Sequence, residues 1–190
     1  KEIINSGVLG ELIEVDIQFN GYARRWDWQT LESFNGGGLR NTGPHPLDQA
    51  LNILDNYDEM PNVFCKMNLV NTFGDANDYC KLILTAPNKP LIDLTISSCD
   101  AYPCFTYKIH GKKGGLKGTM QHIDWKYFDP AKAPEQHLIR ESLSKEDGTP
   151  AYCGETLPWV EEAWDGDPNA VFNTSVGTYY NMVYEHIVNN

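Results

Sequence analysis

A run of short apolar segments between residues 62 and 128 constrains the fold of this chain more than any other feature. The connections between the segments are too short for the helical crossover that parallel neighbours require. Pro87 and Pro90 flank Asn88 and mark a hairpin turn between the second and third segments. Strands that follow one another here are therefore expected to pair antiparallel. The candidate strands cover residues 62–71, 78–85, 91–98, 105–110, 115–120 and 122–128.

The segments on either side of this run carry other signals. Residues 11–23 alternate apolar and polar side chains, which predicts a strand with one wet face. Residues 42–56 and the closing stretch 178–190 have the apolar spacing of helices. Residues 24–35 and 130–167 are expected to be loops, the second with short helical pieces. The buried stripe of the first helix is expected to be Leu47, Ala50, Leu51 and Leu54.

This order of elements predicts an α+β domain with a mostly antiparallel, open-faced sheet and helices on one face. The bare face of such a sheet needs a cover, and a second domain or a partner subunit is the natural one. The first residue is Lys1 rather than Met, and residues 1–6 have the pattern of a helix end closed by Gly7. We therefore expect residues 1–190 to be one domain of a longer protein that continues at both ends.

Composition excludes several classes of function. A net charge of −11 at pH 7 argues against a nucleic-acid or anionic-membrane surface, which needs clustered Lys and Arg. The five cysteines show neither CxxC spacing nor a Cys/His ligand pattern, so neither a metal site nor a disulfide framework is expected. A reducing cytoplasm is the simplest location for them. No apolar run approaches the ~20 residues of a transmembrane helix.

The segment from Gly36 to Gln49 concentrates the candidate chemistry. Three consecutive glycines let the backbone pass close to a ligand. Asn41, His45 and Asp48 follow at helical spacing, and a histidine near a helix N-terminus favours the neutral imidazole. Such an imidazole can accept a hydroxyl proton as the carbon loses hydride, and Asp48 could fix its tautomer. The alternative is an ordinary helix cap beside an exposed histidine.

Residues 36–54 resemble the signature of the C-terminal domain of the Gfo/Idh/MocA oxidoreductases, the glucose–fructose oxidoreductase and inositol dehydrogenase family. In that family a glycine run and a hydrophobe precede Asp-x-x-x-His-x-x-Asp. Residues 1–13 are similar to the family's junction after the nucleotide-binding domain. Residues 109–116 resemble its glycine hairpin, and residues 179–185 resemble its late helix. The resemblance is weakest over residues 130–167.

The resemblance implies an N-terminal Rossmann domain that binds NAD or NADP, followed by this dihydrodipicolinate-reductase-like domain. The second domain would line the substrate pocket and carry a homo-oligomer interface on its open sheet. The implied reaction moves hydride between a sugar or polyol carbinol and nicotinamide. His45 would be the acid/base, and Asn41 and Asp48 would contact the substrate. Gly37 and Gly38 mark where the backbone could approach the cofactor.

Some residues depart from this pattern or leave alternatives open. Asn41 replaces the usual Asp, and an amide cannot take a proton from a hydroxyl. Arg24 and Trp26, with Arg25 and Trp28 beside them, occupy the place of a substrate-facing loop, although an exposed loop with anchored aromatics would look the same. The chain has neither G-x-G-x-x-G nor Glu-Lys-Pro, so we do not expect it to turn over alone.

Two other classes of function stay open. The first is a non-catalytic sugar-binding or assembly module of the same fold, which Asn41 and the missing cofactor motif would suit. The second is a hydrolase that uses His45 and Asp48, although no nucleophile motif such as G-x-S-x-G accompanies them.

Overall fold

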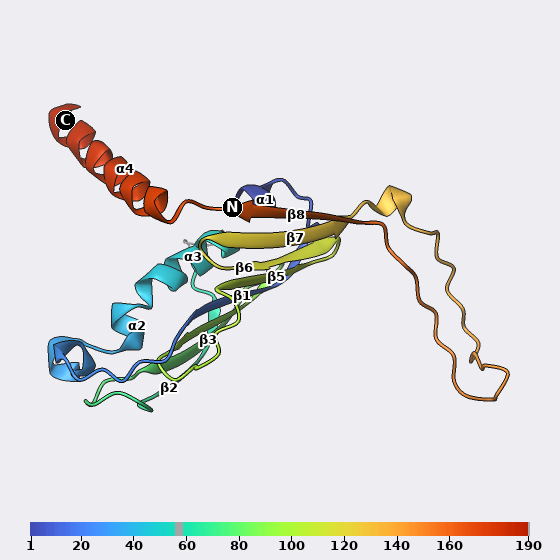
Figure 1. Ribbon diagram of the computed structural model, residues 1–190, viewed down its shortest axis with the longest axis horizontal. Helices are drawn as coiled ribbons and strands as arrows, with labels where there is room; N and C mark the ends of the chain where they lie inside the picture. Colours follow the sequence, from blue (N-terminus) through green and yellow to red (C-terminus); the bar gives the residue numbers. More distant parts are fainter. Residues whose placement is uncertain (56–58, 190) are drawn as a thin grey trace.

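A single mixed sheet forms the body of the chain in the computed structural model, which describes residues 1–55 and 59–189 (Figure 1). Within these residues the sheet has eight strands in the order β2-β3-β4-β1-β5-β6-β7-β8. All neighbours are antiparallel except β1 and β4, so the predicted α+β class is confirmed. The strands are β1 (Leu12–Asn20), β2 (Asn62–Asn68), β3 (Tyr79–Thr85), β4 (Leu91–Ser97), β5 (Tyr107–Gly111), β6 (Gly114–Gly118), β7 (His122–Phe128) and β8 (Trp159–Asp165).

The first strand occupies the middle of the sheet. Val15 pairs with Ile92 of β4 in parallel and with Ile109 of β5 in antiparallel orientation. The antiparallel prediction is right for β2 to β4 and for β5 to β7, but wrong for β4 and β5, which β1 separates. Connection length restricts only strands that follow one another, and it says nothing of a strand inserted from elsewhere. The apolar face of β1, with Val15 and Ile17 fully buried, suits it to this central place.

Helices cover one face of the sheet. α1 (Glu2–Asn5), α2 (Gly38–Asn41) and α3 (Pro44–Leu54) lie there, and α3 packs on β1 and β4. The stripe predicted for α3 is confirmed, since Ala50 and Leu54 are buried and Leu47 and Leu51 pack beside them. α3 begins at Pro44 rather than residue 42, because the glycine run forms the separate helix α2. Residue 56, the predicted end, lies outside the described residues.

The opposite, open face is polar and charged. Val15 and Ile17 point to the helices, so the alternating Glu14 and Asp16 point the other way. Asp16 lies between Asp93 of β4 and Lys108 of β5. Burial, together with the charges of Glu14 and Asp93, raises the pKa of the Asp16 carboxyl. Helices on one face and a bare second face are therefore both present as predicted.

The C-terminal third differs from the prediction. Residues 159–165, expected to be loop, form β8, and α4 (Pro168–Asn189) begins earlier than the predicted residue 178. β8 is an edge strand with charged residues, so only its pairing with β7 identifies it. His122 of β7 contributes to this pairing through Asp165 at 2.7 Å, and it also contacts Asp124 at 3.0 Å. The hydrogen bonds to Asp165 and Asp124 raise the pKa of His122.

Two parts extend away from the sheet in Figure 1. Residues 129–158 form a long arm between β7 and β8, with one short helical turn at Pro130–Lys132 as predicted. α4 leaves the other end of β8 and continues past the edge of the sheet. No helix among the described residues is long and apolar enough to cross a bilayer.

Candidate functional site

The candidate site lies at the end of the sheet where β1 and β4 finish. Residues 21–37, 69–78 and 98–106 form three loops at this end. The Asn71 side chain joins all three, because its amide donates to the Ala23 carbonyl (3.0 Å) and to the Ser98 carbonyl (2.9 Å). The sequence pattern gave no sign of Asn71, since its partners are distant in the chain.

The glycine run crosses closely over other backbone. Gly37 donates its N–H to the Gln29 carbonyl at 2.9 Å, and Gly38 donates to the Asn77 carbonyl at 2.6 Å. Gly37 has a φ of +109°, which favours glycine. A Cβ at Gly36 would lie 2.2 Å from the Gln29 carbonyl oxygen. The glycines are therefore required by contacts inside the chain.

Asn77 fixes the start of α2. Its side-chain oxygen accepts the Leu39 N–H at 3.1 Å, while its backbone carbonyl accepts from Gly38. One residue thus satisfies two of the free N–H groups at the helix start. Sequence analysis missed Asn77, because it lies in a loop far along the chain from the glycines.

Asn41 and His45 belong to two successive helices rather than to one. Asn41 ends α2, Gly43 makes the corner, and His45 is in the first turn of α3. Both side chains are exposed at the same end of the sheet. The His45 N–H donates to the Thr42 carbonyl at 3.2 Å, and no side chain in the described part of the chain hydrogen-bonds to its imidazole. The ring nitrogens of His45 therefore have no hydrogen-bond partner among the described residues.

Asp48 lies one turn after His45 on α3 and is held from the C-terminal side. The Asn52 amide donates to the Asp48 carbonyl at 3.0 Å and to its carboxylate at 3.3 Å. Lys1 in turn donates to the Asn52 side-chain oxygen at 3.0 Å. These contacts connect Asp48 to the start of the chain, and its tautomer-fixing role toward His45 stays a prediction.

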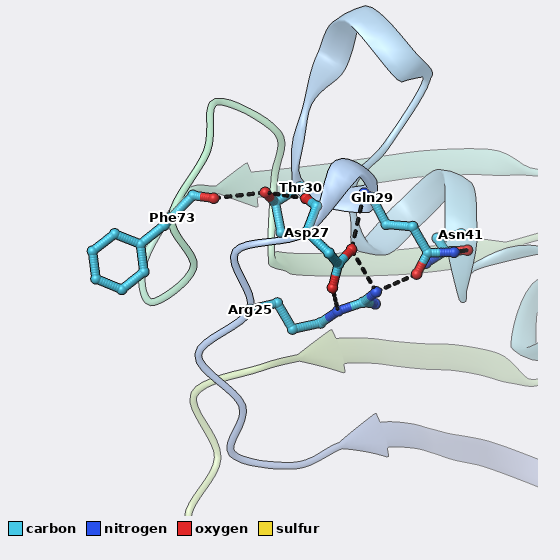
Figure 2. Close-up of polar contacts among 6 residues, drawn as sticks. All are labelled: Arg25, Asp27, Gln29, Thr30, Asn41 and Phe73. Atoms are coloured by element: carbon cyan, nitrogen blue, oxygen red, sulfur yellow. Dashed lines mark hydrogen bonds and ion pairs between the residues drawn. The ribbon is translucent and has the colours of Figure 1, made fainter.

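A row of polar contacts connects the loop at residues 24–35 to Asn41 (Figure 2). The Arg25 guanidinium binds both Asp27 carboxylate oxygens, at 2.9 and 2.8 Å, and also donates to the Gln29 side-chain oxygen. Gln29 then donates its amide to the Asn41 side-chain oxygen at 3.4 Å. Desolvation would raise the pKa of Asp27, but the Gln29 N–H and the Arg25 guanidinium outweigh it and hold that pKa below its usual range.

The two loop residues predicted to bind substrate are both exposed. The Arg24 guanidinium lies 5.1 Å from the centre of the Phe73 ring, a cation–π contact. Trp26 has 79% of its surface exposed, so it is not an anchor in the core. Gln29, which accepts a hydrogen bond from Arg25, is the residue of this loop that bonds to Asn41.

The loop that carries Asn77 depends on the buried Asp78. Its carboxylate accepts three backbone N–H bonds of 2.7 Å, from Val70, Asn71 and Thr72. Burial raises the pKa of Asp78, but these N–H donors outweigh burial and hold it below its usual range. The carboxylate therefore stabilises the fold in its charged form.

Replacing Asp78 by asparagine is expected to lower the free energy of unfolding by about 2 kcal/mol at pH 7, since one N–H group then faces an amide donor. A lowered pKa stabilises the fold above the unfolded value of about 3.9, and this part is lost as pH falls through the folded value. Urea unfolding at pH 7 and pH 3 should therefore show a difference that shrinks in acid. Glu141→Gln on the exposed arm is the control, and its unfolding midpoint should stay unchanged. Equal stability of Asp78→Asn and the parent at pH 7 would contradict the assignment.

Two cavities lie outside this group of residues. The larger, about 810 Å³, is on the open face over β5 to β8. The smaller, about 440 Å³, lies on the helical face between α1, α3 and β5 to β7, and Asp48 is at its rim. His45 lines neither of them. In this chain the candidate site is therefore an exposed surface around His45, outside both cavities.

Among the described residues, the open face also carries a group of three carboxylates that could hold a cation. Oxygens of Glu14, Asp16 and Asp93 lie within 4.8 Å of one another. Lys81 pairs with Asp93 at 2.6 Å and supplies a counter-charge. The cluster is on the face opposite α3, so it takes no part in the candidate site.

Comparison with known proteins adds a family and several relatives. A family model described as the GFO/IDH/MocA C-terminal domain matches residues 1–117. A relative in Escherichia coli (strain K12), 2,7-anhydro-N-acetylneuraminate hydratase, is 28% identical over 129 residues. The match covers 64% of this chain and 34% of the hydratase. The chain therefore spans about a third of the length of that relative.

Solved structures share the fold at low identity. An oxidoreductase from Bacillus cereus is 14% identical, with a TM-score of 0.61 over 88% of this chain and 54% of that one. An NAD-binding protein from Listeria innocua is 15% identical, with a TM-score of 0.61 over 95% and 52%. The WlbA dehydrogenase from Bordetella pertussis, in complex with NADH and UDP-GlcNAcA, is 19% identical, with a TM-score of 0.53 over 68% and 40%.

Proposed function

Because the chain belongs to the GFO/IDH/MocA C-terminal domain family, we propose that it is the substrate-binding and oligomerisation half of an NAD(P)-dependent oxidoreductase. The substrate class is a sugar or polyol, and the reaction moves hydride between its carbinol carbon and nicotinamide. The E. coli relative is named for a sugar derivative, and the B. pertussis dehydrogenase was solved with a sugar nucleotide. Both support a sugar.

The observation that carries the proposal is the exposed imidazole of His45 beside Asn41, within the matched family segment. The imidazole accepts the hydroxyl proton as the carbinol is oxidised, and it returns the proton in the reverse direction. The Asn41 amide hydrogen-bonds a neighbouring hydroxyl, and the Arg25 and Gln29 side chains hold that amide in place. Asp48 is a further substrate contact in this proposal, together with Arg24 and Trp26 on the loop.

The glycine run does not form a dinucleotide cradle with the other described residues. The space in front of Gly36 and Gly37 is filled by the Gln29 carbonyl and by Asn77. The nicotinamide cofactor, held by another domain of the full-length protein, would supply the hydride acceptor. This chain then supplies only the substrate side of the site. Gly37 and Gly38 would approach the cofactor but would not hold it.

We further propose that the open sheet face forms a homo-oligomer interface. Its charged rows and its cavity of about 810 Å³ lack any cover within the described part of the chain. We also propose a cytoplasmic location and a cofactor that is either NAD or NADP. Assays with each cofactor, run in both directions, identify the cofactor and the direction of the reaction.

A second candidate is hydration or elimination on a sugar acid. The E. coli relative is a hydratase, and His45 could move a proton in such a reaction as well. A non-catalytic sugar-binding module, the third candidate, is favoured by the amide at Asn41.

The test is an assay of the full-length protein with NAD and NADP over a panel of sugars, polyols and sugar acids. We expect cofactor reduction at 340 nm with at least one carbinol substrate, and none from residues 1–190 alone. Product formation without net cofactor reduction would favour the hydratase candidate. Sugar binding without any product would favour the non-catalytic module. If the protein neither binds a sugar nor forms a product, all three candidates are excluded.

A further inference from the structure

His122 is held between two carboxylates at one end of the β7–β8 pairing. Its Nδ1 lies 2.7 Å from an oxygen of Asp165, and its Nε2 lies 3.0 Å from an oxygen of Asp124. An ionised carboxylate only accepts hydrogen bonds, so both ring nitrogens must carry a proton for both contacts to be hydrogen bonds. The arrangement therefore fits the charged imidazolium and not the neutral ring.

The contact lies at a strand end that has little else to hold it. β8 is an edge strand with every residue exposed, and β7 is its neighbour among the described strands. His122 and Asp165 form the last pair of this ladder. Just beyond it, the Gly166 N–H donates to the Gln121 carbonyl at 2.7 Å. The side-chain contact of His122 with Asp165 therefore reinforces the place where the ladder stops.

The other end of β8 is held by contacts of a different kind. The Trp159 ring packs edge-on against Phe128, with the ring centres 5.7 Å apart. The Lys126 ammonium lies 5.0 Å from the centre of the Trp159 ring. Neither kind of group changes its charge near neutral pH, since aromatic rings of Trp and Phe do not titrate and lysine ordinarily titrates at about pH 10. Only the His122 end of β8 has a contact that titrates near neutral pH.

The charges around the imidazole determine the direction of its response to pH. They are Asp165 of β8, Asp124 of β7, Lys117 opposite Asp124 on β6, and Asp167 in the link to α4. The hydrogen bond to Asp165, followed by that to Asp124, raises the pKa of His122. The unfolded value is about 6.5, so the contact stabilises the strand end fully below that pH while the aspartates are ionised. This contribution is lost as the pH rises through the folded value.

We propose that His122 is a pH switch: its imidazolium holds the end of β8 on β7, and its neutral ring releases that end as the pH rises. A neutral imidazole keeps one N–H, so it can donate to only one of the two carboxylates, and its other nitrogen then turns a lone pair toward the second. Asp165 and Gly166, the residues that are released, lead directly into α4. This switch goes beyond the proposed reaction and does not depend on it.

Amide hydrogen exchange of the full-length protein at pH 5.5 and pH 8.5 tests the proposal. Protection factors, which remove the intrinsic effect of pH on exchange, should be about 2- to 5-fold lower at pH 8.5 for residues 163–166, the size expected of an exposed ion-pair network. Residues 159–161, at the Trp159 end of the same strand, should keep their protection. Equal protection of residues 163–166 at the two pH values would overturn the proposal, and so would an equal loss along the whole strand.

Two variants assign the effect to the imidazole. His122→Gln is neutral at both pH values, so the difference in protection between them should disappear. His137→Gln on the arm is the matched control and should keep the difference. Both histidines are exposed, so neither variant should lose its fold, which circular dichroism would check. A pH dependence that persists in His122→Gln would show that another group controls the strand end.

Discussion

Replacing His45 by alanine in the full-length protein should lower kcat by about 10²- to 10⁴-fold, the usual contribution of a positioned acid/base. The imidazole of His45 is exposed and has no hydrogen-bond partner among the described residues, so it is available to a substrate hydroxyl. Its side chain is exposed, and we therefore expect the unfolding midpoint to stay the same. The measurement is steady-state turnover on the sugar identified in the panel.

His137→Ala is the matched control for this variant. His137 is also exposed, but it lies on the arm, far along the chain from the glycine run. Turnover of the control should equal that of the parent protein. Equal turnover of His45→Ala and the parent would remove His45 from the mechanism, while the proposed reaction class could still stand.

Gly36→Ala should be a severely damaging substitution in the candidate site, although it adds only one methyl group. Its new Cβ would lie 2.2 Å from the Gln29 carbonyl oxygen and 2.8 Å from that of Leu31. Backbone cannot move aside as a side chain can, so overpacking should lower the free energy of unfolding by about 3 kcal/mol or more. Because Gln29 would be displaced, its contact with Asn41 should be lost as well. Urea unfolding of the chain measures the first effect.

Gly21→Ala is the control for the same loop. A Cβ at Gly21 would meet no atom within 4 Å. Alanine should leave stability unchanged or raise it by up to about 1 kcal/mol, since the unfolded chain loses freedom. A Gly36→Ala variant as stable as Gly21→Ala would mean that the loop tolerates the extra atom and that the glycine is not needed for packing.

Much of the fold could be predicted because burial leaves a local pattern. The alternation in β1 and the stripe of α3 both record which face packs on the core. The place of β1 between β4 and β5 leaves no such pattern, because pairing depends on contacts between distant segments. β8 was missed for a related reason, since an exposed edge strand has no buried face to mark it.

In the candidate site, too, local sequence patterns could be recognised, whereas contacts between distant segments could not. His45 and Asn41 could be found because they stand in one short segment next to a glycine run. Asn77 could not, because its role as a helix cap for α2 comes from a loop that folding brings close. The same holds for Asn71, which joins three loops, and for the contact between Gln29 and Asn41.

The central position of β1 also bears on how this chain folds during synthesis. β1 leaves the ribosome first, but its two neighbours, β4 and β5, come much later in the sequence. Long separations between pairing strands slow folding, because the loop entropy must be overcome before the contacts form. Until residue 111 has emerged, Val15 and Ile17 lack their complete sheet, and the open strand edges can aggregate. The nascent chain should therefore be a strong candidate for chaperone binding while residues 12–111 are being translated.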